Sequence, residues 1–121
     1  MYIDFTICSN DTNFNELKKI FSNSTIIYKG ELLKNGKRIP YNEFNLVFEQ
    51  QNIVYVNDLI TSFKNTIGKK IDFLSGYIKS NQLNSSFCVV IKEDERPAIS
   101  IENENLIFLC SLNATIDFDF I

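Results

Sequence analysis

The alternation of apolar and polar side chains along this chain predicts an α+β fold, with a single, largely antiparallel sheet and helices packed on one face. Several short segments repeat with a period of two, which is typical of half-buried strands. Between them, apolar residues recur every three or four positions, as on amphipathic helices. The chain has 121 residues, 45% of them hydrophobic and 22% charged, which suits one domain with its own core. We therefore expect a single α+β domain over residues 1–121, in the order β-α-β-β-α-β-β-α-β.

The first quarter of the chain predicts a strand, a helix and a second strand. Residues 2–8 alternate, with three apolar side chains on one side of the strand: Ile3, Phe5 and Ile7. Asn13 followed three residues later by Glu16 is a variant of the capping box, so a short helix begins there and ends near residue 22. Residues 25–29 are β-branched and aromatic, and predict a short second strand.

The next segment predicts a small hairpin and a third strand. Asn35-Gly36 is a strong signal for a type I′ turn between residues 31–34 and 37–39. This basic loop carries a net charge of +3 from Lys29, Lys34, Lys37 and Arg38 against Glu31. Such a loop either contacts an anion or a partner, or it is solvated and protects a sheet edge. Residues 43–49 then alternate as a further amphipathic strand.

The longest element is a helix expected over residues 57–81. Its apolar stripe steps by three and four: Ile60, Phe63, Ile67, Ile71, Leu74 and Ile78. Asn57 is the expected N-cap, and Gly68 and Gly76 are weak points that kink or end helices. We expect this helix to lie across the sheet and form one wall of the core.

The last third predicts two strands, a helix and a closing strand. Residues 86–92 are rich in β-branched side chains and predict a strand. Residues 93–96 form a turn, and Pro97 opens a strand over 97–102. A helix follows over 103–112, where Asn113 can adopt the left-handed conformation that ends it. Residues 114–121 alternate again as the final strand.

Composition excludes several function classes. The chain has no histidine, so Ser/His/Asp triads, Cys/His dyads and histidine metal sites are ruled out. A net charge of −3 and a pI near 4.9 argue against nucleic acid as a partner. No glycine motif signals a phosphate cradle, and we expect no cofactor, no metal and no membrane span. The three cysteines lack a C-x-x-C pair and are expected to be reduced and mostly buried, in a cytoplasmic protein.

Two groups of carboxylates are candidates for chemistry. Glu93, Asp94 and Glu95 either hold a divalent cation weakly or form a solvated turn, and the second is favoured. Asp117 and Asp119 project from the same face of the last strand, and paired carboxylates serve as acid and base in glycoside hydrolysis. That role also needs a substrate cleft, of which the sequence gives no sign. We therefore expect no catalytic residues and no enzyme activity.

Strand parity predicts an acidic sheet face. If the apolar sides all face the helices, six acids share the opposite face with Lys92, for a local net charge of −5: Asp4, Glu43, Glu49, Glu102, Asp117 and Asp119. This face is either a solvated surface that resists stacking or a docking surface for a basic protein partner. These six residues are the candidate partner-binding site.

Four segments have a layout that is found in a known family: the opening strand Tyr2-Ile3-Asp4-Phe5-Thr6-Ile7, the aromatic strand around Phe44, the Arg96-Pro97-Ala98-Ile99-Ser100 run and the ending at residues 112–120. In these segments the chain resembles the bacterial domain-of-unknown-function family 4279, small stand-alone proteins. Family members often carry tryptophan at the position of Phe44 and glycine at that of Asn113. The resemblance implies an α+β fold in which the first and last strands are neighbours, which would bring Asp4 close to Asp117 and Asp119. It implies no catalytic residues.

The sequence therefore predicts a non-catalytic protein-interaction domain, either an immunity or antitoxin-like protein or an accessory protein, with a basic partner. The alternative is a small-ligand-binding domain or minor enzyme that uses a pocket between the sheet and the long helix. Oligomeric state is open.

Overall fold

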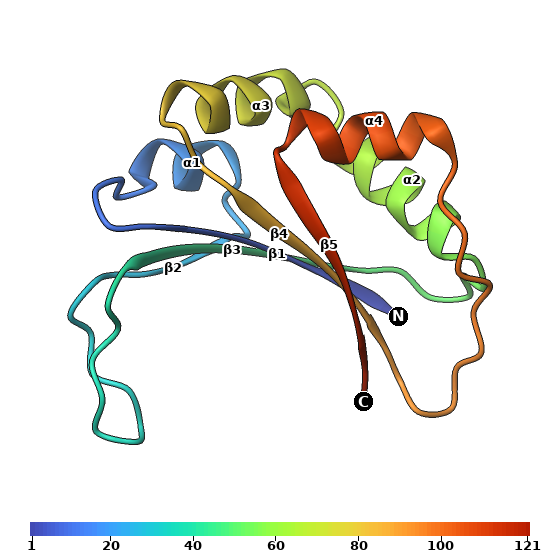
Figure 1. Ribbon diagram of the computed structural model, residues 1–121, viewed down its shortest axis with the longest axis horizontal. Helices are drawn as coiled ribbons and strands as arrows, with labels where there is room; N and C mark the ends of the chain where they lie inside the picture. The colour runs from blue at the N-terminus through green and yellow to red at the C-terminus, as the bar shows by residue number, and fades with distance from the viewer.

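The computed structural model describes all residues, 1–121, as one five-stranded sheet with four helices on one face (Figure 1). The sheet order is β2-β3-β1-β4-β5. The strands are β1 (Tyr2–Ser9), β2 (Thr25–Ile27), β3 (Asn42–Glu49), β4 (Ser85–Ile91) and β5 (Ala114–Phe120). The helices are α1 (Asn15–Ile20), α2 (Val56–Ile67), α3 (Lys70–Ser80) and α4 (Asn103–Ser111). The α+β class predicted from the sequence is confirmed.

The sheet is mixed, which corrects part of the predicted topology. β1 lies at its centre and is antiparallel to both β3 and β4, and β2 is antiparallel to β3. β4 and β5 are parallel, because the chain returns through α4 before it enters β5. A parallel pair needs such a crossover, whereas antiparallel strands can be joined by a tight turn.

The strand predicted over 97–102 does not join the sheet. Its one β-bridge is a parallel bridge from Ala98 to Tyr55, next to the start of α2. The Ala98 amide donates to the Val54 carbonyl oxygen at 3.0 Å, and the Val56 amide donates to the Ala98 carbonyl oxygen at 3.1 Å. The segment is extended and apolar on alternate residues, but its backbone is satisfied by the connection before α2. The element order therefore has five strands rather than six.

The helix predicted over 57–81 is two helices, with a break at Gly68. This glycine has a φ of 58° and a ψ of −125°, and its amide donates to the Lys64 carbonyl oxygen as the C-cap of α2. Gly76 lies inside α3 without a break. α2 begins at Val56 with Tyr55 as its N-cap, so Asn57 is in the first turn rather than at the cap.

Asn57 instead links α2 to α4. Its side-chain oxygen accepts hydrogen bonds from the Glu102 amide at 2.9 Å and from the Asn105 side chain at 2.8 Å. Asn105 is only 2% exposed and also donates to the Thr61 hydroxyl oxygen at 3.0 Å. The two asparagines therefore hold the start of α4 against α2.

The turn at Asn35-Gly36 differs in type from the prediction. Gly36 has a positive φ of 83°, whereas Asn35 does not. The Leu33 amide donates to the Lys37 carbonyl oxygen at 2.7 Å and the Gly36 amide donates back to the Leu33 carbonyl oxygen at 3.0 Å. The loop therefore uses three residues, with glycine at positive φ, which is the next most common hairpin connection after the two-residue turns.

The core is one cluster of 23 buried residues between the sheet and the helices. Phe63 of α2 lies at its centre, in contact with the rings of Phe5, Phe48, Phe87 and Phe108 at centroid distances of 5.4–6.3 Å. Such aromatic pairs stabilise a core beyond the area that they bury. Because the strands alternate, their other side chains all point away from the helices.

The cysteines are free, but the prediction that they are mostly buried is wrong. Cys8 and Cys110 are exposed and Cys88 is partly exposed. Cys8 and Cys88 have the strand parity of the helix-free face, and Cys110 lies on the outer side of α4. None of the four helices combines the length and the apolar character needed to cross a membrane.

Candidate functional site

No helix covers one face of the sheet, which we call the open face (Figure 1). It is formed by alternate residues of all five strands, and the strand registers arrange their side chains in rows across the sheet. One row runs through Val47, Asp4, Cys88 and Asp117, and the next through Glu49, Tyr2, Val90 and Asp119. A third contains Thr25, Asn45, Thr6, Ser86 and Thr115.

Five of the six predicted acids lie on this open face, and Glu102 does not. Glu102 is the N-cap of α4, and its amide donates to Asn57. The sequence predicts Glu102 on this face only through the strand expected at 97–102, which does not join the sheet. Five of the 15 acids and Lys92 of the 12 basic residues therefore share the face, which carries −4 while the remainder carries +1.

The acids are concentrated toward one end of the open face. Asp4, Glu49, Asp117 and Asp119 occupy two adjacent rows, which we call the acidic cluster. Glu43 lies four residues from Val47 along β3, roughly 13 Å away at the usual rise per residue. It is therefore separate from the cluster.

β1 and β5 are not neighbours, contrary to the expectation that came with the family resemblance. β4 lies between them, so that Asp4 and Asp117 flank Cys88 in one row. Two strand spacings put them about 10 Å apart. The three aspartates of the cluster therefore surround the thiol rather than touch each other.

Asp4 is held in place by two polar neighbours. Its carboxylate accepts a hydrogen bond from the Asn45 amide nitrogen and one from the Thr6 hydroxyl at 3.2 Å. The Asn45 nitrogen also lies 3.1 Å from the Thr6 hydroxyl oxygen. The Asp4 charge is therefore fixed in position but not neutralised.

A single ion pair lies on the open face. Lys92 Nζ and a Glu49 carboxylate oxygen are 3.8 Å apart, and both side chains are more than 40% exposed. An exposed pair of this kind contributes about 0–1 kcal/mol. Asp4, Asp117 and Asp119 have no basic partner.

The pKa of the Cys88 thiol reflects burial and the negative charge of these aspartates. Its pKa is raised, first by burial and then by Asp119, Asp4 and Asp117. The thiol therefore stays protonated and poorly nucleophilic at neutral pH. Sequence reasoning placed the aspartates on one face but did not predict a thiol among them.

Cys8 lies at the other end of the open face, beside Glu43. Although Cys8 is exposed, its pKa is raised first by partial desolvation of the sulfur and then by Glu43, whose carboxylate oxygen is 3.9 Å from the sulfur. The pKa of the Tyr41 hydroxyl is raised as well, mainly by Cys8. The Cys8 thiol and the Tyr41 hydroxyl therefore stay protonated at neutral pH.

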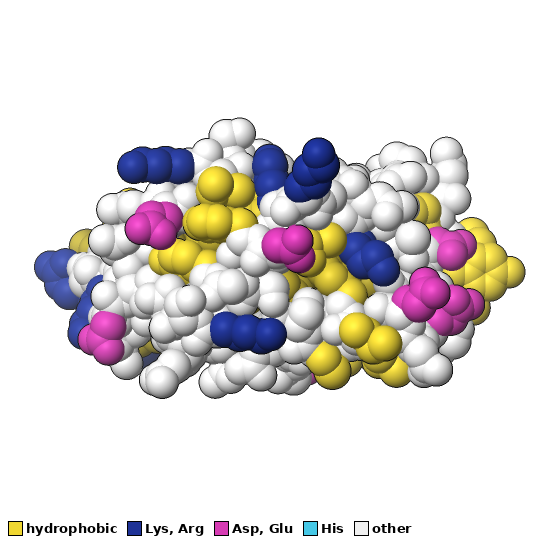
Figure 2. Space-filling view, turned by 90° about the horizontal axis from the view of Figure 1, so that it is seen from above, with side chains coloured by type: hydrophobic (Ala, Val, Ile, Leu, Met, Phe, Trp, Pro, Cys, Tyr) yellow, Lys and Arg dark blue, Asp and Glu magenta, His cyan; other side chains and the backbone are white.

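The open face presents a surface rather than a cleft. None of the five pockets of the structure is lined by one of its carboxylates. No group of three or more Cys, Asp or Glu residues is placed to hold a metal ion. The helix side has a different character, because lysine, arginine and acidic side chains are interspersed there with hydrophobic ones (Figure 2).

The basic loop projects from the sheet on the side away from the helices (Figure 1). It precedes β3 at Asn42, whereas the acidic cluster includes Glu49 at the other end of that strand. Arg38 donates to the Gly30 carbonyl oxygen at 2.8 Å, and the lysines are exposed. The two charged regions therefore lie at opposite ends of β3.

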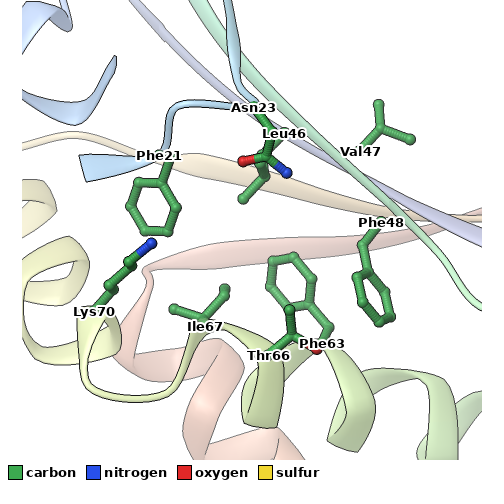
Figure 3. Close-up of a pocket in the computed structure, with 9 residues that line it drawn as sticks. All are labelled: Phe21, Asn23, Leu46, Val47, Phe48, Phe63, Thr66, Ile67 and Lys70. Atoms are coloured by element: carbon green, nitrogen blue, oxygen red, sulfur yellow. The ribbon is translucent and has the colours of Figure 1, made fainter. Parts of the chain in front are cut away.

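A pocket of about 190 Å³ lies between β3, α2 and the segment after α1 (Figure 3). Most of its lining is apolar, and Lys70 is its only charged residue. It is the gap between sheet and helix that the alternative prediction requires.

Neither a protein-family model, nor a curated protein, nor a solved structure matches this chain. The resemblance to the domain family described above stays a prediction.

Proposed function

We propose that this protein is a non-catalytic protein-interaction domain that binds a basic protein through the acidic cluster of its open face. The observation that carries the proposal is the charge separation. The open face holds −4 although the rest of the chain is slightly basic, and three of its aspartates have no cation beside them.

An uncovered face is ordinary for an antiparallel sheet, so openness alone supports nothing. Unpaired carboxylates grouped on such a face cost stability, because like charges close together on a sheet repel each other. A complementary basic surface would relieve that repulsion and accelerate encounter. Tyr2 and the exposed Val47 lie among the acids and supply apolar area for the centre of an interface.

A basic partner suggests a protein that acts on nucleic acid. Such proteins expose lysine and arginine to meet phosphate, and a surface of carboxylates can occupy the same groups. An immunity or antitoxin-like protein that neutralises a basic toxin fits this chemistry. An accessory protein for another basic partner is the broader form of the proposal.

The test is capture and kinetics with a charge-reversed variant. Asp117→Lys with Asp119→Lys is the informative variant, because both side chains are exposed and neither forms a hydrogen bond within the chain. Asp4 is left intact since its carboxylate accepts hydrogen bonds. The matched control, Glu16→Lys with Asp72→Lys, makes the same charge change at exposed positions on the helix side.

We expect the wild type and the control to capture one basic protein from the native host that the variant does not capture. The association rate of the variant should fall about tenfold or more at low salt, and the loss should shrink as salt screens the field. If the folded variant binds like the wild type, the proposal is wrong. The basic loop over Lys29–Arg38 then becomes the better candidate.

A further inference from the structure

The pocket between sheet and helices is apolar inside. Five of its side chains belong to the core or pack against it: Phe21, Leu46, Phe48, Phe63 and Ile67. Figure 3 shows them around one space, with Phe63 and Ile67 rising from α2 and Leu46 and Phe48 coming from β3. A ligand in this space would therefore contact apolar side chains as well as the polar groups of the lining.

The pocket is open because β2 is short. β2 pairs with β3 only as far as Thr25 opposite Asn45, so the outer edge of β3 beyond that residue has no strand beside it. The preceding turn is held by its own hydrogen bonds, from Lys18 Nζ to the Ser22 carbonyl oxygen and from the Ser24 hydroxyl to the Phe21 carbonyl oxygen. The opening of the pocket therefore follows from where β2 ends and from the conformation of this turn.

One cation stands at this mouth. Lys70 is the first residue of α3, and its amine points toward the Phe21 ring, with the nitrogen 5.5 Å from the ring centroid (Figure 3). The two ion pairs of the protein involve other groups, and no acidic residue lines the pocket. The positive end of the α3 dipole adds to the same potential. Asn23 and Thr66 are the polar neighbours.

We propose that this pocket binds a small carboxylic acid whose apolar part is the size of one aromatic ring or a short alkyl chain. A protein cavity of about 150 Å³ holds benzene, so about 190 Å³ accommodates a ring and a short chain. The carboxylate would replace the Phe21 ring as the partner of the Lys70 amine. The inference concerns a different surface from the acidic cluster and does not depend on it.

The test compares three probes that share a ring and chain length: 3-phenylpropionate, 3-phenylpropan-1-ol and 3-phenylpropylamine. Amide chemical shifts of the labelled protein report where each probe binds. We expect 3-phenylpropionate to bind with a Kd of about 1 mM or tighter and to shift the amides of residues 21–23, 46–48 and 63–70. The alcohol should bind about tenfold more weakly, and the amine should not bind.

Two lysine variants separate the charge at the pocket from charge in general. Lys70→Gln should weaken 3-phenylpropionate about tenfold and leave the alcohol unchanged. Lys69→Gln removes the same charge from the adjacent residue, which does not line the pocket, and should change neither Kd. Asp117→Lys with Asp119→Lys should also leave both unchanged, so failure here is distinct from failure of the protein-binding proposal.

Three results would overturn the inference. They are no saturable shift at pocket residues up to about 10 mM probe, equal affinity for the acid and the amine, or equal weakening by the two lysine substitutions. A further variant keeps the test independent of Lys70. Thr66→Tyr adds a ring at an exposed position of the mouth, and should abolish binding of both the acid and the alcohol while the spectrum stays that of the folded protein.

Discussion

At the scale of single residues, Phe63 pairs with more aromatic rings than any other side chain. Its side chain is 1% exposed and contacts rings from β1, β3, β4 and α4. Phe63→Ala removes these contacts and leaves a cavity that the surrounding rings fill only in part. We expect a loss of about 3–5 kcal/mol in the free energy of unfolding, measured in urea. A loss below about half a kcal/mol would mean that α2 is not a wall of the core.

The pH dependence of Cys88 labelling tests whether the aspartates lie near this thiol. Its raised pKa arises first from burial and then from Asp119, Asp4 and Asp117, so part of the shift should depend on the carboxylates. In a variant with Cys8→Ser and Cys110→Ser, thiol labelling of Cys88 should reach half its maximal rate above the pH of an ordinary thiol. Asp117→Asn with Asp119→Asn should lower that pH, but not to the ordinary value because burial persists. An unchanged labelling profile would contradict the proximity of the aspartates.

The raised pKa of Cys88 also makes the free energy of unfolding fall at alkaline pH. The folded chain favours the neutral thiol, so this contribution is complete below the ordinary thiol pKa and is lost as pH rises through the higher folded value. Between pH 8 and pH 10, therefore, the wild type should lose more unfolding free energy than a Cys88→Ser variant.

At the scale of elements, the two glycines of the paired helices predict opposite effects. Gly76 lies within α3 with open space where a Cβ would go, so Gly76→Ala should stabilise the protein by about 0.5–1 kcal/mol. Gly68 has a φ of 58° at the end of α2, where alanine is strained, so Gly68→Ala should cost about 1–2 kcal/mol. Urea unfolding of the two variants and the wild type measures both changes in stability. Equal effects would show that the break does not need glycine.

The break itself illustrates what local patterns can predict. The apolar stripe continues from Ile67 to Ile71 and predicts one helix. The spacing of apolar residues is the same whether or not the backbone changes direction between them. The sequence marks Gly68 as a weak point, but local periodicity does not show whether a helix bends there or ends, and in the structure α2 ends there. Helical periodicity therefore predicted the buried residues better than the boundaries.

At the scale of the whole molecule, alternation predicted the strands that form the sheet and the side on which the helices pack. It could not distinguish a strand from an extended connection at 97–102, since both alternate and only long-range pairing separates them. That error moved Glu102 onto the open face, while the parity of Asp4, Glu43, Glu49, Asp117 and Asp119 agrees with the observed registers. The pocket beside Lys70 depends on where β2 stops and α3 starts, so no single segment signals it.

Charge separation also predicts a response of the folded state to salt. The acidic cluster repels itself, so added salt should raise the Tm of the wild type by screening. Asp117→Lys with Asp119→Lys removes much of that repulsion and should show a Tm equal to or slightly above that of the wild type at low salt, with a smaller rise on adding salt. Thermal melts at two ionic strengths measure both. A lower Tm for the variant at low salt would mean that the aspartates stabilise the fold.

The central position of β1 has a consequence for how the chain is made. This strand is synthesised before the other four, yet its partners are residues 42–49 on one side and residues 85–90 on the other. Once residue 49 has been synthesised, β3 can pair with β1 and β2 with β3, but the second edge of β1 stays bare until β4 follows. Contacts between such distant segments slow folding, and bare strand edges invite association with other chains. Chaperone dependence during synthesis would thus come from the order of the strands rather than from low stability of the finished domain.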